Sequence, residues 1–175
     1  MPVKSVSVEA GNGKKFDPLP PDVYQVEILD IEEREGTKYQ SSEVETQISV
    51  KFVVIEAGPH YGRFIWSSCS PKVTGGTKQS KLYQVIVAAL NREFTRDELQ
   101  KAHEIVTPEF LNGLIGKQLR LTLSQKDKQD GSGRTNKIEA YMPKKTDLAK
   151  YDENKKADEA LSAGQQAESD VPFDN

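Results

Sequence analysis

The first sustained pattern along the chain is an alternation of apolar and polar residues, which is typical of a β-strand with one buried face. Over residues 23–33, Tyr24, Val26 and Ile28 lie on one side and polar residues on the other. At 29–31 the alternation changes face, as a β-bulge would make it do. We therefore expect a bulged first strand, with ordered structure beginning at Val23.

Two more strands are predicted before the pattern changes. A polar loop, 34–45, leads to a strand over 46–56, and the turn 57–62 leads to a third strand over 63–70. The inward residues of the second strand are Ile48, Val50, Phe52 and Val54. In the third strand Phe64 and Trp66 share one face, and the sequence leaves open whether that face is core or surface.

Helical patterns follow. Residues 80–91 carry a single apolar stripe with the spacing of an amphipathic helix. Thr95 and Glu98 have the spacing of a capping box, in which each side chain caps the other residue's backbone N–H. Thr107 followed by a proline is a second helix start.

Alternation returns beyond Gly116, with leucines at every second position, and the loop 125–134 leads to a last strand over 135–142. Three strands, a helical segment and two strands is the order of the OB-fold, a five-stranded partly open β-barrel. The loops 34–45 and 125–134 would flank its ligand face. The fold class we expect is thus mainly β, with another small α+β sheet as the alternative.

The predicted organisation has three parts. Residues 1–21 form an arm rich in Gly and Pro, and 22–143 form the OB-fold domain with a helical insertion at about 71–115. Residues 144–175 form a flexible, disordered acidic tail rich in Ala, Gln, Glu and Lys.

Charge is distributed unequally between these parts. The 175 residues carry a net charge of −3, and the last 25 carry two Lys against seven Asp and Glu, which leaves residues 1–150 with +2. A basic body with an acidic tail is the pattern expected when the body binds a polyanion. A single cysteine, Cys69, and the lack of an apolar signal or membrane segment lead us to expect a cytoplasmic protein with no membrane partner.

Catalytic chemistry finds no support in the residue pattern. The two histidines, His60 and His103, have no partner set, and no Cys/His spacing suits zinc. The stretch GGTKQSK over 75–81 lacks the spacing of a phosphate-binding P-loop. We therefore expect no enzyme activity, no cofactor and no metal site.

Rings interleaved with cations point instead to a binding surface for unpaired nucleotides, since bases stack on aromatic side chains while Lys and Arg neutralise phosphates. The predicted DNA-binding residues are Arg34, Lys38, Tyr39, Lys51, Arg63, Phe64, Trp66, Arg120, Lys126, Lys128, Arg134, Lys137 and Tyr141.

The tail tip adds a resemblance. An acidic segment with Pro-Phe near its end, here Asp170, Val171, Pro172 and Phe173, resembles the C-terminal tip of bacterial and phage single-stranded DNA-binding proteins. The layout of DVYQVEILDIEE, GPHYGRFIW, a helical insert and a strand pair is more similar to the phage-encoded members. In that family the Phe usually ends the chain, whereas Asp174 and Asn175 follow it here.

The resemblance implies a non-enzymatic protein of replication, recombination and repair that protects single strands and recruits partner proteins through its tail tip. The alternative is a protein-binding structural or adaptor protein whose acidic tail increases solubility. The sequence leaves open whether the chain forms homo-oligomers.

Overall fold

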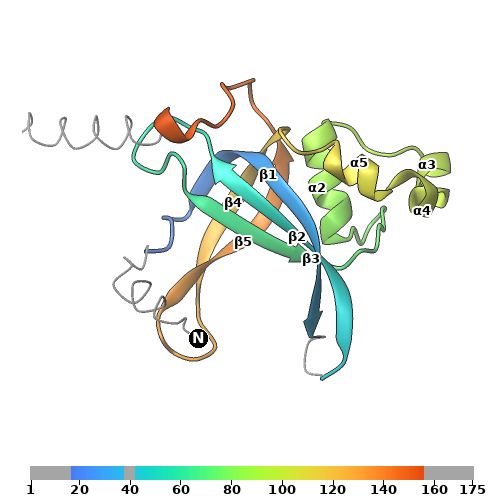
Figure 1. The fold of residues 1–175 in the computed structure, drawn as a ribbon, viewed down its shortest axis with the longest axis horizontal. Helices are drawn as coiled ribbons and strands as arrows, with labels where there is room; N and C mark the ends of the chain where they lie inside the picture. Colours follow the sequence, from blue (N-terminus) through green and yellow to red (C-terminus); the bar gives the residue numbers. More distant parts are fainter. Residues whose placement is uncertain (1–16, 38–41, 156–175) are drawn as a thin grey trace, which may run out of the picture.

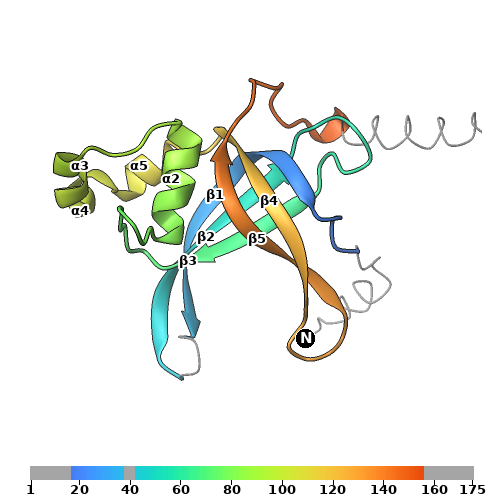
Figure 2. The same cartoon turned by 180° about the vertical axis from the view of Figure 1, so that it is seen from behind.

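A computed structural model describes residues 17–37 and 42–155 of the chain. Within these residues five antiparallel strands form one sheet in the order β3-β2-β1-β4-β5, and four short helices lie between β3 and β4 (Figures 1 and 2). The strands are β1 (Asp22–Thr37), β2 (Val44–Val54), β3 (Phe64–Cys69), β4 (Gln118–Asp127) and β5 (Arg134–Pro143). The helices are α2 (Lys81–Leu90), α3 (Arg96–Gln100), α4 (Ala102–Ile105) and α5 (Pro108–Asn112). The mainly β class with helices between the third and fourth strands is confirmed.

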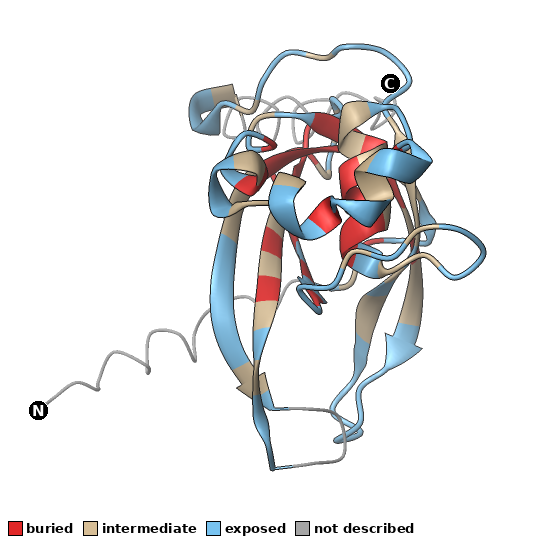
Figure 3. Cartoon of the chain, turned by 90° about the vertical axis from the view of Figure 1, so that its right-hand side faces the viewer, coloured by how far each residue is buried: buried red, intermediate tan, exposed pale blue. Residues whose placement is uncertain are grey.

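Both long hairpins extend further than the hydrophobic pattern predicts. β1 and β2 stay paired as far as Thr37 and Val44, and β4 and β5 as far as Asp127 and Arg134, so both predicted loops are too long. Antiparallel strands can pair through their backbones without a buried face. The paired residues at these ends are polar, so the alternation of apolar and polar residues does not reveal them. The ends of the two hairpins project from the same end of the molecule, downward in Figures 1 and 3.

A bulge in each hairpin changes which face a residue points to. In β1 the register shifts between Ile28 and Asp30, which confirms the bulge expected from the sequence. In the β4–β5 pair the register shifts between Thr122 and Leu123, so that Glu139 of β5 is the extra residue. Since one inserted residue reverses the alternation, the residues of β5 on either side of Glu139 follow different parities.

One face of the curled sheet forms the main core together with the helices, where Figure 3 shows the buried residues concentrated. The inward side chains of β2 and the apolar stripe of α2 pack there, and α2 contacts β4 and β5. The largest fully buried side chains include Tyr83, Phe52, Ile28, Leu82 and Ile86. The predicted inward face of β2 is confirmed.

The two outermost strands of the sheet meet through their side chains. Ser67 Oγ of β3 and Tyr141 Oη of β5 lie 2.7 Å apart in a hydrogen bond, and the Tyr141 ring lies 6.4 Å from the Phe52 ring in the core. Burial raises the pKa of the Tyr141 phenol to about 12. The sheet is thus curled strongly enough to bring its first and last strands into contact.

Residues 144–155, which we call the strap, lie across the outer face of β1 and β4. The strap begins the segment that the sequence predicts to be a flexible tail. The side chain of Gln25 donates to the Thr146 carbonyl (2.7 Å), and that of Gln118 donates to the Leu148 carbonyl (2.6 Å). Gln25 and Gln118 are buried, and each also accepts a backbone N–H of the strap. Buried amides need partners, and the strap supplies them.

The last residues of the predicted N-terminal arm are likewise fixed to the sheet. Leu19 is buried, its N–H donates to Asn136 Oδ1 (2.8 Å), and its carbonyl accepts from Asn136 Nδ2 (2.8 Å) and Gln125 Nε2 (3.1 Å). Tyr24 Oη donates to the Pro20 carbonyl at 2.6 Å. Residues 17–21 therefore lie against the β4–β5 hairpin, in continuity with β1.

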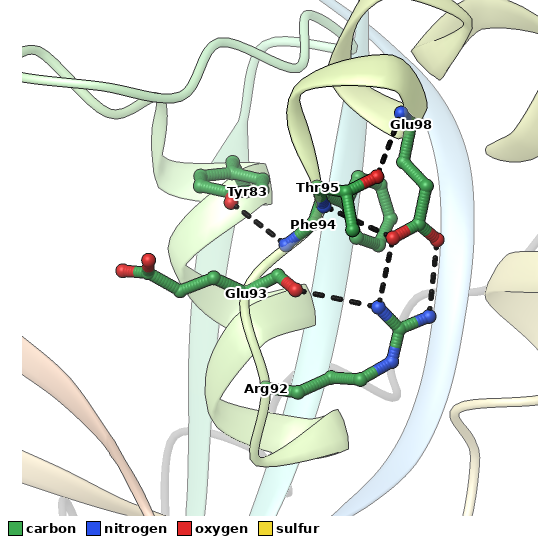
Figure 4. Close-up of polar contacts among 6 residues, drawn as sticks. All are labelled: Tyr83, Arg92, Glu93, Phe94, Thr95 and Glu98. Carbon is green, nitrogen blue, oxygen red and sulfur yellow. Dashed lines mark hydrogen bonds and ion pairs between the residues drawn. The ribbon is translucent and has the colours of Figure 1, made fainter.

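The helical insert is stabilised by the capping box that the sequence predicts. Thr95 Oγ1 accepts from the Glu98 N–H (3.2 Å), and Glu98 Oε1 accepts from the Thr95 N–H (3.0 Å), as Figure 4 shows. The Arg92 guanidinium donates to both carboxylate oxygens of Glu98. Tyr83 Oη accepts from the buried Phe94 N–H, which joins α2 to the start of α3. The Thr107 cap with Pro108 in the first turn is also confirmed.

The Glu98 contacts predict an unusual titration. The Arg92 side chain, followed by the Thr95 backbone, lowers the pKa of Glu98 from 4.5 to about 2. Because the folded-state pKa is depressed, the stabilisation is present above pH 4.5 and is lost as the pH falls through about 2. The ¹³C shift of the Glu98 carboxyl should report this midpoint. Arg92→Ala should move it toward 4.5 and Arg96→Ala should not; an ordinary midpoint in the native protein would contradict the geometry.

The contact between the outermost strands predicts a measurable coupling. Ser67→Ala and Tyr141→Phe should each lower the free energy of unfolding by about 1 kcal/mol, as for an ordinary buried hydrogen bond. A double-mutant cycle from urea denaturation should give a coupling free energy of at least about 0.5 kcal/mol. Ser70→Ala, at an exposed position just after the same strand, serves as the control and should change stability by less than about 0.5 kcal/mol. Additive losses would show that the two hydroxyls do not interact.

Candidate functional site

The face of Phe64 and Trp66, which the sequence leaves open, is the surface. In β3 the alternate residues Ile65, Ser67 and Cys69 are buried, and Trp66 is 55% exposed. The Phe64 and Trp66 rings are 5.9 Å apart, edge to face. Phe64 is half-buried, so Trp66 is the ring that this face leaves open to a ligand.

Lys51 of β2 places a positive charge over these rings. It pairs with Trp66 across the strands, and its Nζ lies 4.3 Å from the centre of the Phe64 ring and 5.7 Å from that of Trp66. A cation over an aromatic face at an exposed site contributes about 0.5–1 kcal/mol. The contact places a cation next to the exposed Trp66 ring, and a single-strand binding surface combines such cations with exposed rings.

A pocket of about 510 Å³ adjoins the rings where β3 and β5 diverge. It lies between the start of β3 and the β4–β5 hairpin, at some distance along the strands from the Ser67–Tyr141 contact. Its lining residues are Pro18, Gly62, Arg63, Phe64, Ile65, Trp66, Lys128, Arg134, Thr135 and Asn136. The charged residues among these are all cations, and all three were predicted from the sequence.

Backbone and side-chain acceptors orient the two arginines of the pocket. Arg63 Nη2 donates to the Asp17 carbonyl at 2.7 Å. Arg134 Nε lies 3.4 Å from Asp127 Oδ1, and its Nη1 lies 3.5 Å from Gln125 Oε1. The Arg134 side chain remains 59% exposed, so its guanidinium can reach a ligand. A guanidinium held in this way can bind a phosphate through two parallel hydrogen bonds.

Arg34 lies among carboxylates rather than beside the pocket. It forms a 2.8 Å ion pair with Glu32, whose pKa it lowers through a side-chain hydrogen bond. The β1–β2 hairpin also carries Glu33, Glu35, Glu43 and Glu45. This hairpin is acidic, which disfavours a phosphate contact there. The predicted Lys38 and Tyr39 lie outside the described residues.

Arg120 is also separated from the rings. It pairs with Gln25 on β1, whereas Lys51 pairs with Asp30, so the two cations lie at different positions along the sheet. Its Nε donates to the Pro143 carbonyl at 2.8 Å, and it lines a different hollow, with Lys145 and Leu148 of the strap. The structure thus does not place Arg120 with Lys51.

Tyr141 faces the core because of the bulge at Glu139. By simple alternation it would share the outward face of Lys137, but the extra residue reverses the parity and pairs Tyr141 with Leu121. Lys137 stays exposed, 3.6 Å from Glu139. The prediction that Tyr141 lies on the ligand face is therefore corrected. Lys126 is exposed on β4 and does not line the pocket.

Sequence reasoning missed two contributions to this surface. Pro18 forms part of the pocket wall, and Tyr151 of the strap lies 6.2 Å from Phe64 and 6.0 Å from Tyr61. Lys155 lies over the Tyr61 ring at 5.3 Å. Asp152 and Glu153 follow Tyr151 and offset the charges of Lys150 and Lys155, so the strap end of the ring row is not basic. The aromatic residue within a polar tail was the available signal. The predicted partner-binding residues Asp170–Phe173 lie outside the described residues.

Within residues 17–37 and 42–155, no group of three or more His, Cys, Asp and Glu residues could hold a metal ion. No helix in that part is both long enough and apolar enough to span a membrane.

Trp66 is the single tryptophan of the chain, so its fluorescence tests the geometry directly. Iodide should quench it strongly and more efficiently than caesium, because Lys51 and Arg63 attract an anion. Lys51→Ala should reduce the preference for iodide, whereas Lys101→Ala in the helical insert should leave it unchanged. Weak quenching by neutral acrylamide would mean that the ring is buried, and would contradict the outward face.

The chain was also compared with known proteins. It matches no model of a protein family and no curated protein. The arrangement of rings, cations and pocket is therefore the support for a functional proposal.

Proposed function

We propose that this protein binds single-stranded DNA without strong sequence preference. The observation that carries the proposal is the exposed Trp66 ring, with the half-buried Phe64 ring edge-on to it and Lys51 over both, beside a pocket whose charged lining residues are cations. Each base that stacks on an aromatic side chain contributes about 1–3 kcal/mol. Such stacking needs open base faces, which an intact duplex does not offer.

We infer further that the sheet is the barrel of an OB-fold. Three features support this inference: the strand order, the helices between β3 and β4, and the contact of Ser67 with Tyr141 between the outermost strands. In an OB-fold the ligand lies across strands 2 and 3, between the loops that join strands 1 to 2 and 4 to 5. Lys51, Phe64 and Trp66 occupy the corresponding strands, and the basic β4–β5 hairpin flanks them.

The acidic tail would recruit partner proteins in replication, recombination and repair. Phe173 can enter an apolar pocket of a partner while nearby carboxylates meet a basic rim. The strap anchors the beginning of this segment to the sheet through Gln25 and Gln118. In this proposal the tail starts from a fixed point beside the bound strand, and its tip remains available to another protein.

A second candidate, a protein-binding adaptor, is favoured by one observation. The β1–β2 hairpin carries Glu32, Glu33, Glu35, Glu43 and Glu45, and an OB-fold ligand would approach near this hairpin. These carboxylates would repel phosphate and would suit a basic protein surface. The two candidates predict different behaviour with nucleic acid.

A titration separates them. A labelled oligo-dT of about 30 nucleotides should bind in low salt with quenching of Trp66, and a duplex of equal length should bind more weakly. The logarithm of the binding constant should fall with the logarithm of the salt concentration, with a slope of about −0.7 per phosphate neutralised. Arg134→Ala should reduce that slope by about 0.7, whereas Lys101→Ala should not change it. If neither nucleic acid binds, the adaptor function is favoured.

A further inference from the structure

We propose that the pocket between β3 and the β4–β5 hairpin is a discrete site for one nucleotide unit of the strand. The phosphate would lie between Arg63 and Arg134, and the base against Phe64 and Trp66. This inference rests on the proposed function and goes beyond it, because the affinity would be concentrated in one nucleotide rather than spread evenly along the strand.

The size and chemistry of the pocket fit such a unit. Its volume of about 510 Å³ lies within the range of small-ligand sites. One wall carries the two rings, and cations approach from both sides, Arg63 from just before β3 and Arg134 with Lys128 from the hairpin. A ligand that joins a flat ring to a compact anion can contact the aromatic side chains and the cations at the same time.

The pocket is built before any ligand arrives. Asn136 binds both the N–H and the carbonyl of Leu19, which holds Pro18 against the opening of the pocket. Arg63 binds the carbonyl of Asp17 in the same segment. A wall held by these bonds loses little freedom when a ligand binds, so the ordering cost falls mainly on the exposed side chains of Arg134 and Trp66.

The same bonds explain why the site would not read the base. The Asn136 amide, which could otherwise recognise a base edge, uses both its oxygen and its nitrogen on Leu19. The rings contact any base through its face, and the guanidinium groups contact the phosphate. The site would therefore require the phosphate and tolerate different bases.

Binding of a mononucleotide tests the proposal on the full chain. Thymidine monophosphate should quench Trp66 and displace labelled oligo-dT, whereas thymidine and inorganic phosphate should each bind at least tenfold more weakly. Arg134→Ala should weaken the binding of thymidine monophosphate by at least about tenfold, because one or two charge-assisted hydrogen bonds to the phosphate are lost. Lys101→Ala is the matched control and should bind like the native protein. Circular dichroism of each variant checks that it is folded.

The failures of the two proposals are distinguishable. If oligo-dT binds but thymidine monophosphate at millimolar concentration neither quenches Trp66 nor displaces it, the single-nucleotide site is wrong and strand binding stands. Inorganic phosphate that competes as well as the nucleotide would also overturn the site, since the rings would then contribute nothing. If neither oligo-dT nor the nucleotide binds, the proposed function itself fails.

Discussion

The contact between the two outermost strands is the constraint on which the surface depends. Ser67 and Tyr141 can form their hydrogen bond only when the sheet is curled and when both side chains point inward. Alternation along β3 then directs Phe64 and Trp66 outward. The same contact holds β3 and β5 together at one level, and where the two strands diverge at another level the pocket opens. Core and candidate site thus follow from one arrangement of two strands.

The outer face of the sheet has two different uses. At the β1–β4 end it is covered by the strap, which satisfies the buried amides of Gln25 and Gln118 and covers apolar residues such as Val53. At the β3 end the strap does not cover the outer face, and Trp66 is exposed there. Tyr151 lies between the covered and the exposed part, because its ring contacts Phe64 and its backbone N–H donates to Glu27. The strap therefore marks where the open surface ends.

Charge is divided between the two hairpins that project from the same end of the molecule. The β1–β2 hairpin is acidic, and its one described arginine is paired with Glu32. The β4–β5 hairpin contributes two of the three cations of the pocket, Lys128 and Arg134. A polyanion near this end would experience attraction on one side and repulsion on the other. This division would direct a strand toward the pocket and away from β1–β2, which the small net charge of the chain does not reveal.

Much of the fold could be predicted from the sequence, because local periodicity and capping residues indicate where strands and helices lie. The order of the elements, the inward face of β2, the bulge in β1 and the Thr95–Glu98 box are all local patterns of this kind. The three cations that line the pocket are among the residues predicted from the sequence. Periodicity could not show which residues of β5 point inward beyond Glu139, or whether Phe64 and Trp66 face the core or the surface. It also could not show that the strap is fixed to the sheet. Each of these is decided by contacts between residues far apart in the chain, where one inserted residue or one buried amide in need of a partner determines which surface a side chain joins.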